Sequence, residues 1–159
     1  MSLNQTNNFN LNNNIDSDMA LINNLMDSLR YEEAKALLLE KLQKYPNDVD
    51  ILDTLSEVLI SLDESKEAIK ILKKSIELEP EKNPEKYMSL GQLSNYKISL
   101  KNFKKGVELY CNEINSLDLN DKEYINNLKK LKLNLSSAYA SIADLYMTTD
   151  LWYFLYKQL

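Results

Sequence analysis

Apolar residues recur at helical spacing along most of the chain. From Ile15 onward they return every three or four positions, and two of the stripes end at Pro46 and Pro80. This spacing places apolar side chains on one face of an α-helix, and proline disfavours helix in the residue before it. The pattern predicts antiparallel helices and no strand, with helices over residues 16–29, 32–45, 49–62, 65–79, 85–95, 98–116 and 121–149.

The first four predicted helices form two copies of one repeat. Six positions recur 34 residues apart: Leu21, Leu25, Ala34, Leu38, Leu42 and Pro46 match Leu55, Leu59, Ala68, Leu72, Ile76 and Pro80. A 34-residue period in helix–turn–helix order is typical of tetratricopeptide repeats. One helix pair cannot bury its apolar face alone, so copies stack. The predicted fold class is therefore all-α, a tetratricopeptide-repeat solenoid that forms a right-handed superhelix of antiparallel helix pairs.

A third repeat follows at a shorter spacing, and a fourth begins. The six residues from Lys73 recur 31 residues later, which predicts a tight turn near Asn95. The opening helix of a fourth repeat is indicated by Tyr139, Ile142, Ala143 and Tyr146. Residues 1–14 hold seven Asn and no charge, so they cannot bury enough apolar surface to order. The predicted organisation is a disordered Asn-rich tail over 1–14, a solenoid of about three and a half repeats over 15–150, and a divergent apolar tail over 151–159.

The composition argues against catalysis. The chain has no His and a single Cys, Cys111, which excludes a disulfide framework and a Cys/His zinc site. There is no Gly-rich phosphate loop, and the thiol has no obvious base. The chain is therefore predicted not to be an enzyme, with no catalytic residue, metal or cofactor. Cys111 is expected to be a small core residue. No apolar run is long enough to span a membrane.

Charge is distributed unevenly. Residues 16–85 hold 17 acidic and 9 basic side chains, whereas residues 86–159 hold 7 and 10. In a tetratricopeptide superhelix the first helix of each repeat lines the concave groove, and the groove positions hold seven acids and no base. A groove of one sign attracts a partner of the opposite sign. The predicted partner-binding residues are Asp16, Asp27, Asp50, Asp53, Glu57, Glu85, Met88, Gln92 and Asp144.

Solvation and helix capping also account for part of this acidic pattern. Exposed helix faces are charged in most proteins, and Asp16, Asp48 and Asp50 also suit helix N-termini. Among the proposed groove residues, Asp53 is expected to point away from the apolar face of its helix, as is Glu57.

Three stretches resemble one family. They are Glu85–Ser94, Lys105–Leu109 and Leu135–Thr148, the last closing on Asp150. They are similar to the eukaryotic assembly chaperones of large-subunit ribosomal protein four, over roughly residues 18–151. The resemblance implies a chaperone that captures this newly made basic protein and escorts it to ribosome assembly. It also implies a cytoplasmic and nuclear location, and no direct contact with membrane or nucleic acid is expected. The family has further repeats, so we expect a C-terminally shortened member.

An alternative is a general tetratricopeptide adaptor that binds the acidic tail of a heat-shock chaperone. That activity requires cations and an Asn in the groove. Asn23 fits, but Met19, Glu85 and Ser89 stand where cations are needed.

The C-terminal end also predicts self-association. The aromatic residues between Trp152 and Tyr156 have no later helix to pack against, and neither does the face of Tyr139 and Tyr146. Apolar surface at the end of a solenoid promotes association, unless the tail folds back over that face.

Overall fold

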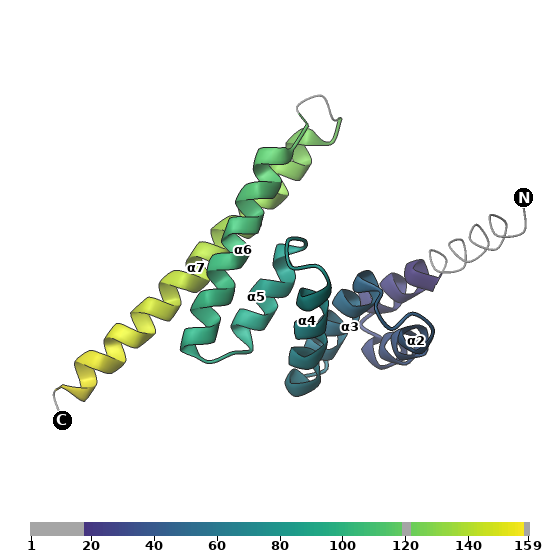
Figure 1. The fold of residues 1–159 in the computed structure, drawn as a ribbon, viewed down its shortest axis with the longest axis horizontal. Helices are drawn as coiled ribbons and strands as arrows, with labels where there is room; N and C mark the ends of the chain where they lie inside the picture. Colours follow the sequence, from purple (N-terminus) through teal and green to yellow (C-terminus); the bar gives the residue numbers. More distant parts are fainter. Residues whose placement is uncertain (1–17, 119–121, 158–159) are drawn as a thin grey trace, which may run out of the picture. The chain divides into compact units, whose positions relative to one another are not determined.

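The computed structural model describes residues 18–118 and 122–157, and within these ranges it contains helices and no strand (Figure 1). The all-α prediction is confirmed. The predicted disordered segment 1–14 lies outside the described residues. The helices are residues 18–27, α2 (Tyr31–Lys44), α3 (Val49–Ser61), α4 (Ser65–Leu78), α5 (Pro84–Gln92), α6 (Tyr96–Ser116) and α7 (Tyr124–Tyr156).

The chain divides into two compact units, Met1–Ile71 and Leu72–Leu159. In the first unit, the alanines of the 34-residue repeat occupy the positions of closest helix packing. Ala34 and Ala68 are fully buried, and so are Leu38 of α2 and Leu55 of α3. The repeat therefore records core positions, as its apolar character predicts.

Polar contacts fix the ends of helices in the first unit. Asp48 caps α3, because its side chain accepts a hydrogen bond from the Ile51 backbone N–H at 3.1 Å. Lys41 of α2 is 7% exposed, and its ammonium group lies 2.5 Å from the Asp18 carboxylate of the preceding helix. A buried cation requires such a partner.

The second unit begins with a tightly built connection between α4 and α5. Asn83 adopts the left-handed conformation, with φ of 53°, and its side chain accepts a hydrogen bond from the Glu85 backbone N–H. Pro84 then occupies the first turn of α5, where no N–H partner is needed.

A three-residue connection joins α5 to α6. α5 ends at Gln92, and Asn95 caps α6 by accepting a hydrogen bond from the Ile98 backbone N–H. This short turn confirms the tight connection that the 31-residue spacing predicts. The two helices pack closely where Gly91 of α5 meets the ring of Phe103 in α6.

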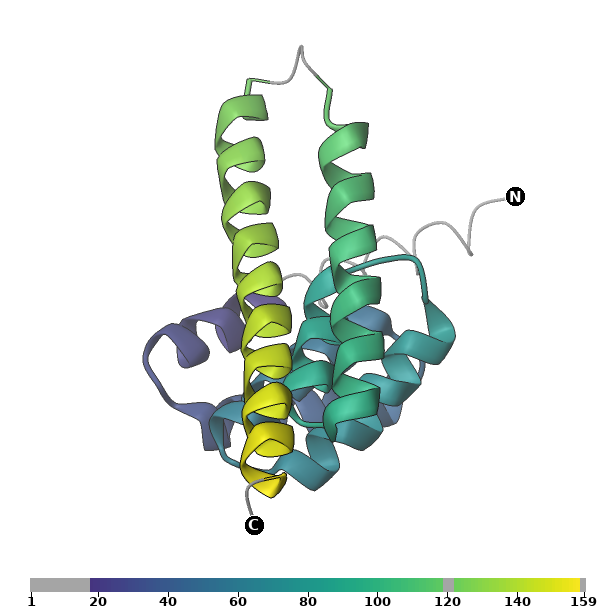
Figure 2. The same ribbon diagram turned by 90° about the vertical axis from the view of Figure 1, so that its left-hand side faces the viewer.

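α6 and α7 form a long antiparallel hairpin (Figure 2). α7 is 33 residues long, and Ala138 is fully buried. The region predicted to be a separate tail from residue 151 continues α7 as helix as far as Tyr156. The tail therefore does not fold back over Tyr139 and Tyr146, which are 54% and 41% exposed.

Candidate partner-binding surface

In the first unit, exposed carboxylates lie on the first helix of each repeat. Asp27 ends the helix of residues 18–27, and Asp50 and Glu57 lie two turns apart on α3; all three are exposed. Asp50 and Glu57 are seven residues apart, so they project from the same side of α3. Asp16 lies outside the described residues. These exposed acids can meet a basic partner without rearrangement of the core.

Asp53 differs from this group. Its side chain is only 9% exposed, whereas the sequence pattern predicts that it points into solvent. The prediction that Asp53 points away from the packed face is wrong. The reason is that the periodicity of α3 shows which residues face its own pair, but it does not show what else covers the helix. A buried carboxylate serves packing and local polar contacts before it can serve a partner.

The second unit presents the other predicted groove residues on α5 and α7. Gln92 and Asp144 are exposed, and Met88 is half-buried. The sulfur of Met88 lies against Gly106 of α6, at 2.9 Å from where a Cβ would stand. Met88 therefore fills space between α5 and α6, and Gln92 and Asp144 are the accessible members of this set.

Glu85 belongs to a polar cluster between α5, α6 and α7. Its carboxylate accepts a hydrogen bond from the side-chain amide of Asn134 at 2.8 Å, and it is also hydrogen bonded to Tyr110. Glu113 lies nearby, and Lys130 stands across the cluster from it. These side chains line a cleft of about 370 Å³. The sequence pattern identifies Glu85 but not the other members, because its partner in α7 is 49 residues away.

The electrostatics of the cluster follow from crowding. Burial raises the pKa of Tyr110, and the neighbouring Glu85 carboxylate raises it further. Burial also raises the pKa of the Glu113 carboxyl, as does Glu85, while Lys130 opposes this shift. Two carboxylates in a partly buried site repel each other. The cluster therefore has a structural charge conflict that one cation offsets in part.

We expect Glu113→Gln to stabilise the protein at pH 7. A carboxyl whose pKa is raised in the folded state binds its proton more tightly there than in the unfolded chain. The free energy of unfolding therefore falls as pH rises from the ordinary pKa of 4.5 through the raised value. Thermal unfolding followed by circular dichroism should give the variant a higher Tm than the wild type at pH 7, and an equal one at pH 4.

The control is Glu77→Gln, at an exposed position of α4. It removes the same charge from the surface of the same unit and should leave Tm nearly unchanged at both pH values. A lower Tm for Glu113→Gln at pH 7 would mean that the ionised carboxylate stabilises the cluster.

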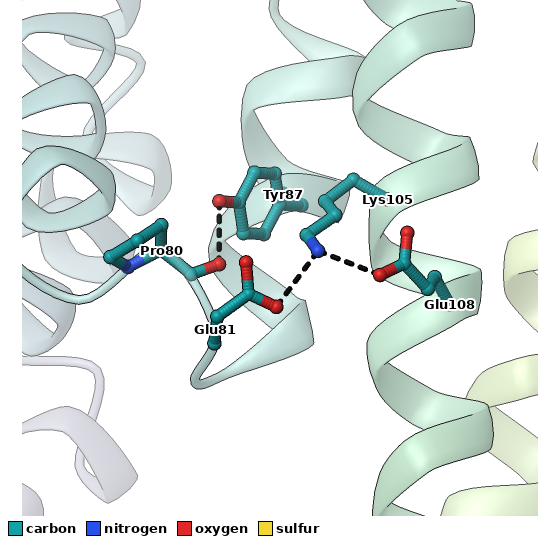
Figure 3. A network of polar contacts seen from close by, with 5 residues as sticks. All are labelled: Pro80, Glu81, Tyr87, Lys105 and Glu108. Carbon is teal, nitrogen blue, oxygen red and sulfur yellow. Dashed lines mark hydrogen bonds and ion pairs between the residues drawn. The ribbon is translucent and has the colours of Figure 1, made fainter.

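A second polar network ties the α4–α5 connection to α6 (Figure 3). The Tyr87 hydroxyl donates a hydrogen bond to the Pro80 carbonyl at 2.8 Å. The Lys105 ammonium group donates to Glu81 at 2.9 Å and to Glu108 at 2.8 Å. These two carboxylates raise the pKa of Lys105, so it stays charged at physiological pH. A cleft of about 420 Å³ borders this network, and its lysine is engaged in holding the connection.

Two properties of the described residues bear on other functions. No group of three or more Cys, Asp or Glu side chains in these ranges is placed to hold a metal ion. Over the same ranges, no helix combines the length and hydrophobicity that crossing a bilayer requires. Cys111, predicted to be a core residue, is half-buried on α6 with a free thiol.

Comparison with solved structures identifies the fold as that of tetratricopeptide repeats. This confirms the predicted fold class. No protein-family model matches the chain, and no curated protein sequence does.

Similar structures include chaperones. The chain is similar to the Assembly Chaperone of RpL4 (Acl4), with a TM-score of 0.76, 16% identity and 84% of this chain covered. The match spans 55% of that protein, so the present chain corresponds to little more than half of it. PcrH, solved in complex with the chaperone binding region of PopD, gives a TM-score of 0.61 at 12% identity, over 81% of this chain and 93% of PcrH. The Sgt2 tetratricopeptide domain from Aspergillus fumigatus gives 0.56 at 17% identity, over 79% and 81%.

Proposed function

We propose that the chain is a protein-binding chaperone that captures a basic segment of its partner through acid-rich first helices. We further propose that the partner is a newly made basic ribosomal protein of the large subunit, large-subunit protein four. The escort of such a partner to ribosome assembly takes place in the cytoplasm and the nucleus. The observation on which the proposal rests is the exposure of Asp27, Asp50 and Glu57 on helices whose apolar positions are buried.

The fold and the sequence resemblance support the same proposal independently. The fold is similar to that of an assembly chaperone of RpL4. The resemblance to chaperones of large-subunit protein four rests on separate residues, in the stretches 85–94, 105–109 and 135–148.

The physics of such binding is long-range attraction followed by many weak contacts. One exposed ion pair contributes about 0.2–1 kcal/mol, so no single carboxylate can account for capture. Carboxylates of one sign raise the rate of encounter with a basic segment, and salt screens that attraction. Binding should therefore weaken with ionic strength, mainly through a slower association rate.

We expect the double reversal Asp50→Lys with Glu57→Lys to weaken binding of purified large-subunit ribosomal protein four about tenfold, which is about 1.4 kcal/mol. Asp53 is left unchanged because it is buried. Surface plasmon resonance at two salt concentrations measures the effect, which should lie mostly in the association rate and shrink at high salt. Circular dichroism should show an unchanged fold.

The matched control is Glu33→Lys with Glu40→Lys on α2. Both are exposed acids on the second helix of the first repeat, and the change in net charge is the same. Binding by this control should stay close to that of the wild type. An equal loss in both double variants would reduce the effect to net charge, and no loss in the first would exclude this surface. Binding of an acidic peptide that ends in a free carboxylate would instead support the heat-shock adaptor alternative.

A further inference from the structure

α7 exposes far more apolar surface than the other helices. Twelve large hydrophobic side chains are exposed among the described residues, and six of them lie on this one helix. Their exposed fractions range from 41% to 69%. They are Ile125, Leu133, Tyr139, Tyr146, Met147 and Tyr153. An apolar face of this extent on a helix indicates an interaction surface.

The third repeat shows what normally covers such a face. In α5, Tyr87 is 7% exposed and Gly91 lies against Phe103 of α6. α7 has the same arrangement 52 residues later, with Tyr139 and Ala143 at the matching positions. There both are exposed. α6 packs on the side of α7 that contains Ala138, so the face that α6 covers on α5 is open on α7.

We propose that a second copy of this chain covers the face, by antiparallel pairing of the two α7 helices. The face fits itself because large and small side chains alternate on it, with two tyrosines beside Ser136, Ala140 and Ala143. When the two helices are registered about residue 141, Tyr139 of each copy lies opposite Ala143 of the other. Tyr146 of each copy then lies opposite Ser136. Such large-against-small matching is what close helix packing requires.

Charge favours the antiparallel direction. Lys129, Lys130 and Lys132 are exposed in the N-terminal half of α7, whereas Asp144 is exposed in the C-terminal half. A parallel pair would bring the two groups of lysines together, at a cost in repulsion. An antiparallel pair separates them and turns each toward the acid-bearing half of the other helix.

The available area is sufficient for a specific dimer. A tyrosine can bury about 200 Å², and the three tyrosines of each face are roughly half exposed. The six in a pair therefore supply on the order of 600 Å², about half of the roughly 1,200 Å² that a specific interface buries. The exposed side chains of Ile125, Leu133 and Met147 add a further contribution from each copy. This dimer is independent of the function proposed above.

Sedimentation equilibrium of the full chain tests the proposal. The wild type should form a dimer, and Ala143→Glu should weaken dimerisation at least tenfold, because it places a charge at the centre of the face. The control Ser137→Glu places the same charge at an exposed position on another side of the same helix and should leave the dimer intact. Both positions are exposed, so circular dichroism should show unchanged helicity. A monomer at all concentrations overturns the proposal, and so does association that Ala143→Glu leaves unchanged.

Cysteine cross-linking tests the direction of pairing. In a Cys111→Ser background, a cysteine at position 140 lies near the symmetry axis of an antiparallel pair, so Ala140→Cys should form a disulfide-linked dimer on oxidation. Leu133→Cys should not, because the two positions lie about sixteen residues out of register, roughly 24 Å apart at 1.5 Å per residue. Equal cross-linking of both variants indicates parallel pairing and overturns the antiparallel arrangement.

Discussion

Asp53→Lys is expected to lower the free energy of unfolding by about 3 kcal/mol or more. The side chain at this position is 9% exposed, and the reversal would place a longer cationic group in a nearly closed space. Its backbone carbonyl also accepts a hydrogen bond from the buried hydroxyl of Ser56, so the surrounding backbone has little freedom to adjust. Denaturant unfolding followed by circular dichroism measures the loss.

Asp50→Lys is the matched control for this reversal. It lies on the same helix, one turn earlier, and is exposed. Asp50 is in the first turn of α3, where a negative charge interacts favourably with the helix dipole, so its reversal should cost about 0.3–1 kcal/mol. Equal losses at positions 50 and 53 would show that Asp53 is as accessible to solvent as its neighbour. It would then return to the partner-binding set.

Gly91→Ala is expected to destabilise the second unit by about 1–3 kcal/mol. A Cβ added at Gly91 would stand 2.4 Å from Cε1 of the Phe103 ring. The ring is 5% exposed and cannot swing away without moving α6. In an unobstructed helix, replacement of Gly by Ala gains about 0.5–1 kcal/mol, so the sign of the measured change separates steric clash from helix propensity.

Gly106→Ala is the control, because it adds the same methyl group to a helix of the same unit. The nearest atom there is the sulfur of Met88, a flexible side chain that can yield. This variant should be neutral or slightly stabilising. Phe103→Leu combined with Gly91→Ala should recover part of the loss, because a smaller side chain makes room for the methyl group. A gain in Tm for Gly91→Ala alone would contradict the close packing of α5 and α6.

The helices were predictable because helical periodicity is a local property of the sequence. The 34-residue repeat also located Ala34 and Ala68, which are fully buried. The last part of α7 was not predictable in the same way, because residues 151–156 are apolar on every side and show no period. Their helical state follows from cooperative extension of a helix that has already formed.

The candidate surface was predictable only in part. The repeat indicates which positions lie on first helices, and Asp27, Asp50 and Glu57 are exposed there. It cannot show what covers a given position, which is why Asp53 was placed wrongly. Nor can it show that Asn134 reaches Glu85, because no short-range pattern connects residues that are 49 positions apart.

Three helix pairs that pack together, α2 with α3, α5 with α6 and α6 with α7, are each consecutive along the chain. Contacts of this kind close short loops, and the entropy lost in forming them is small. Helical proteins built from local contacts fold in microseconds to milliseconds. During synthesis, each pair can form as soon as its second helix leaves the ribosome, before the rest of the chain exists. A chaperone that must meet a newly made protein is thus itself ready early.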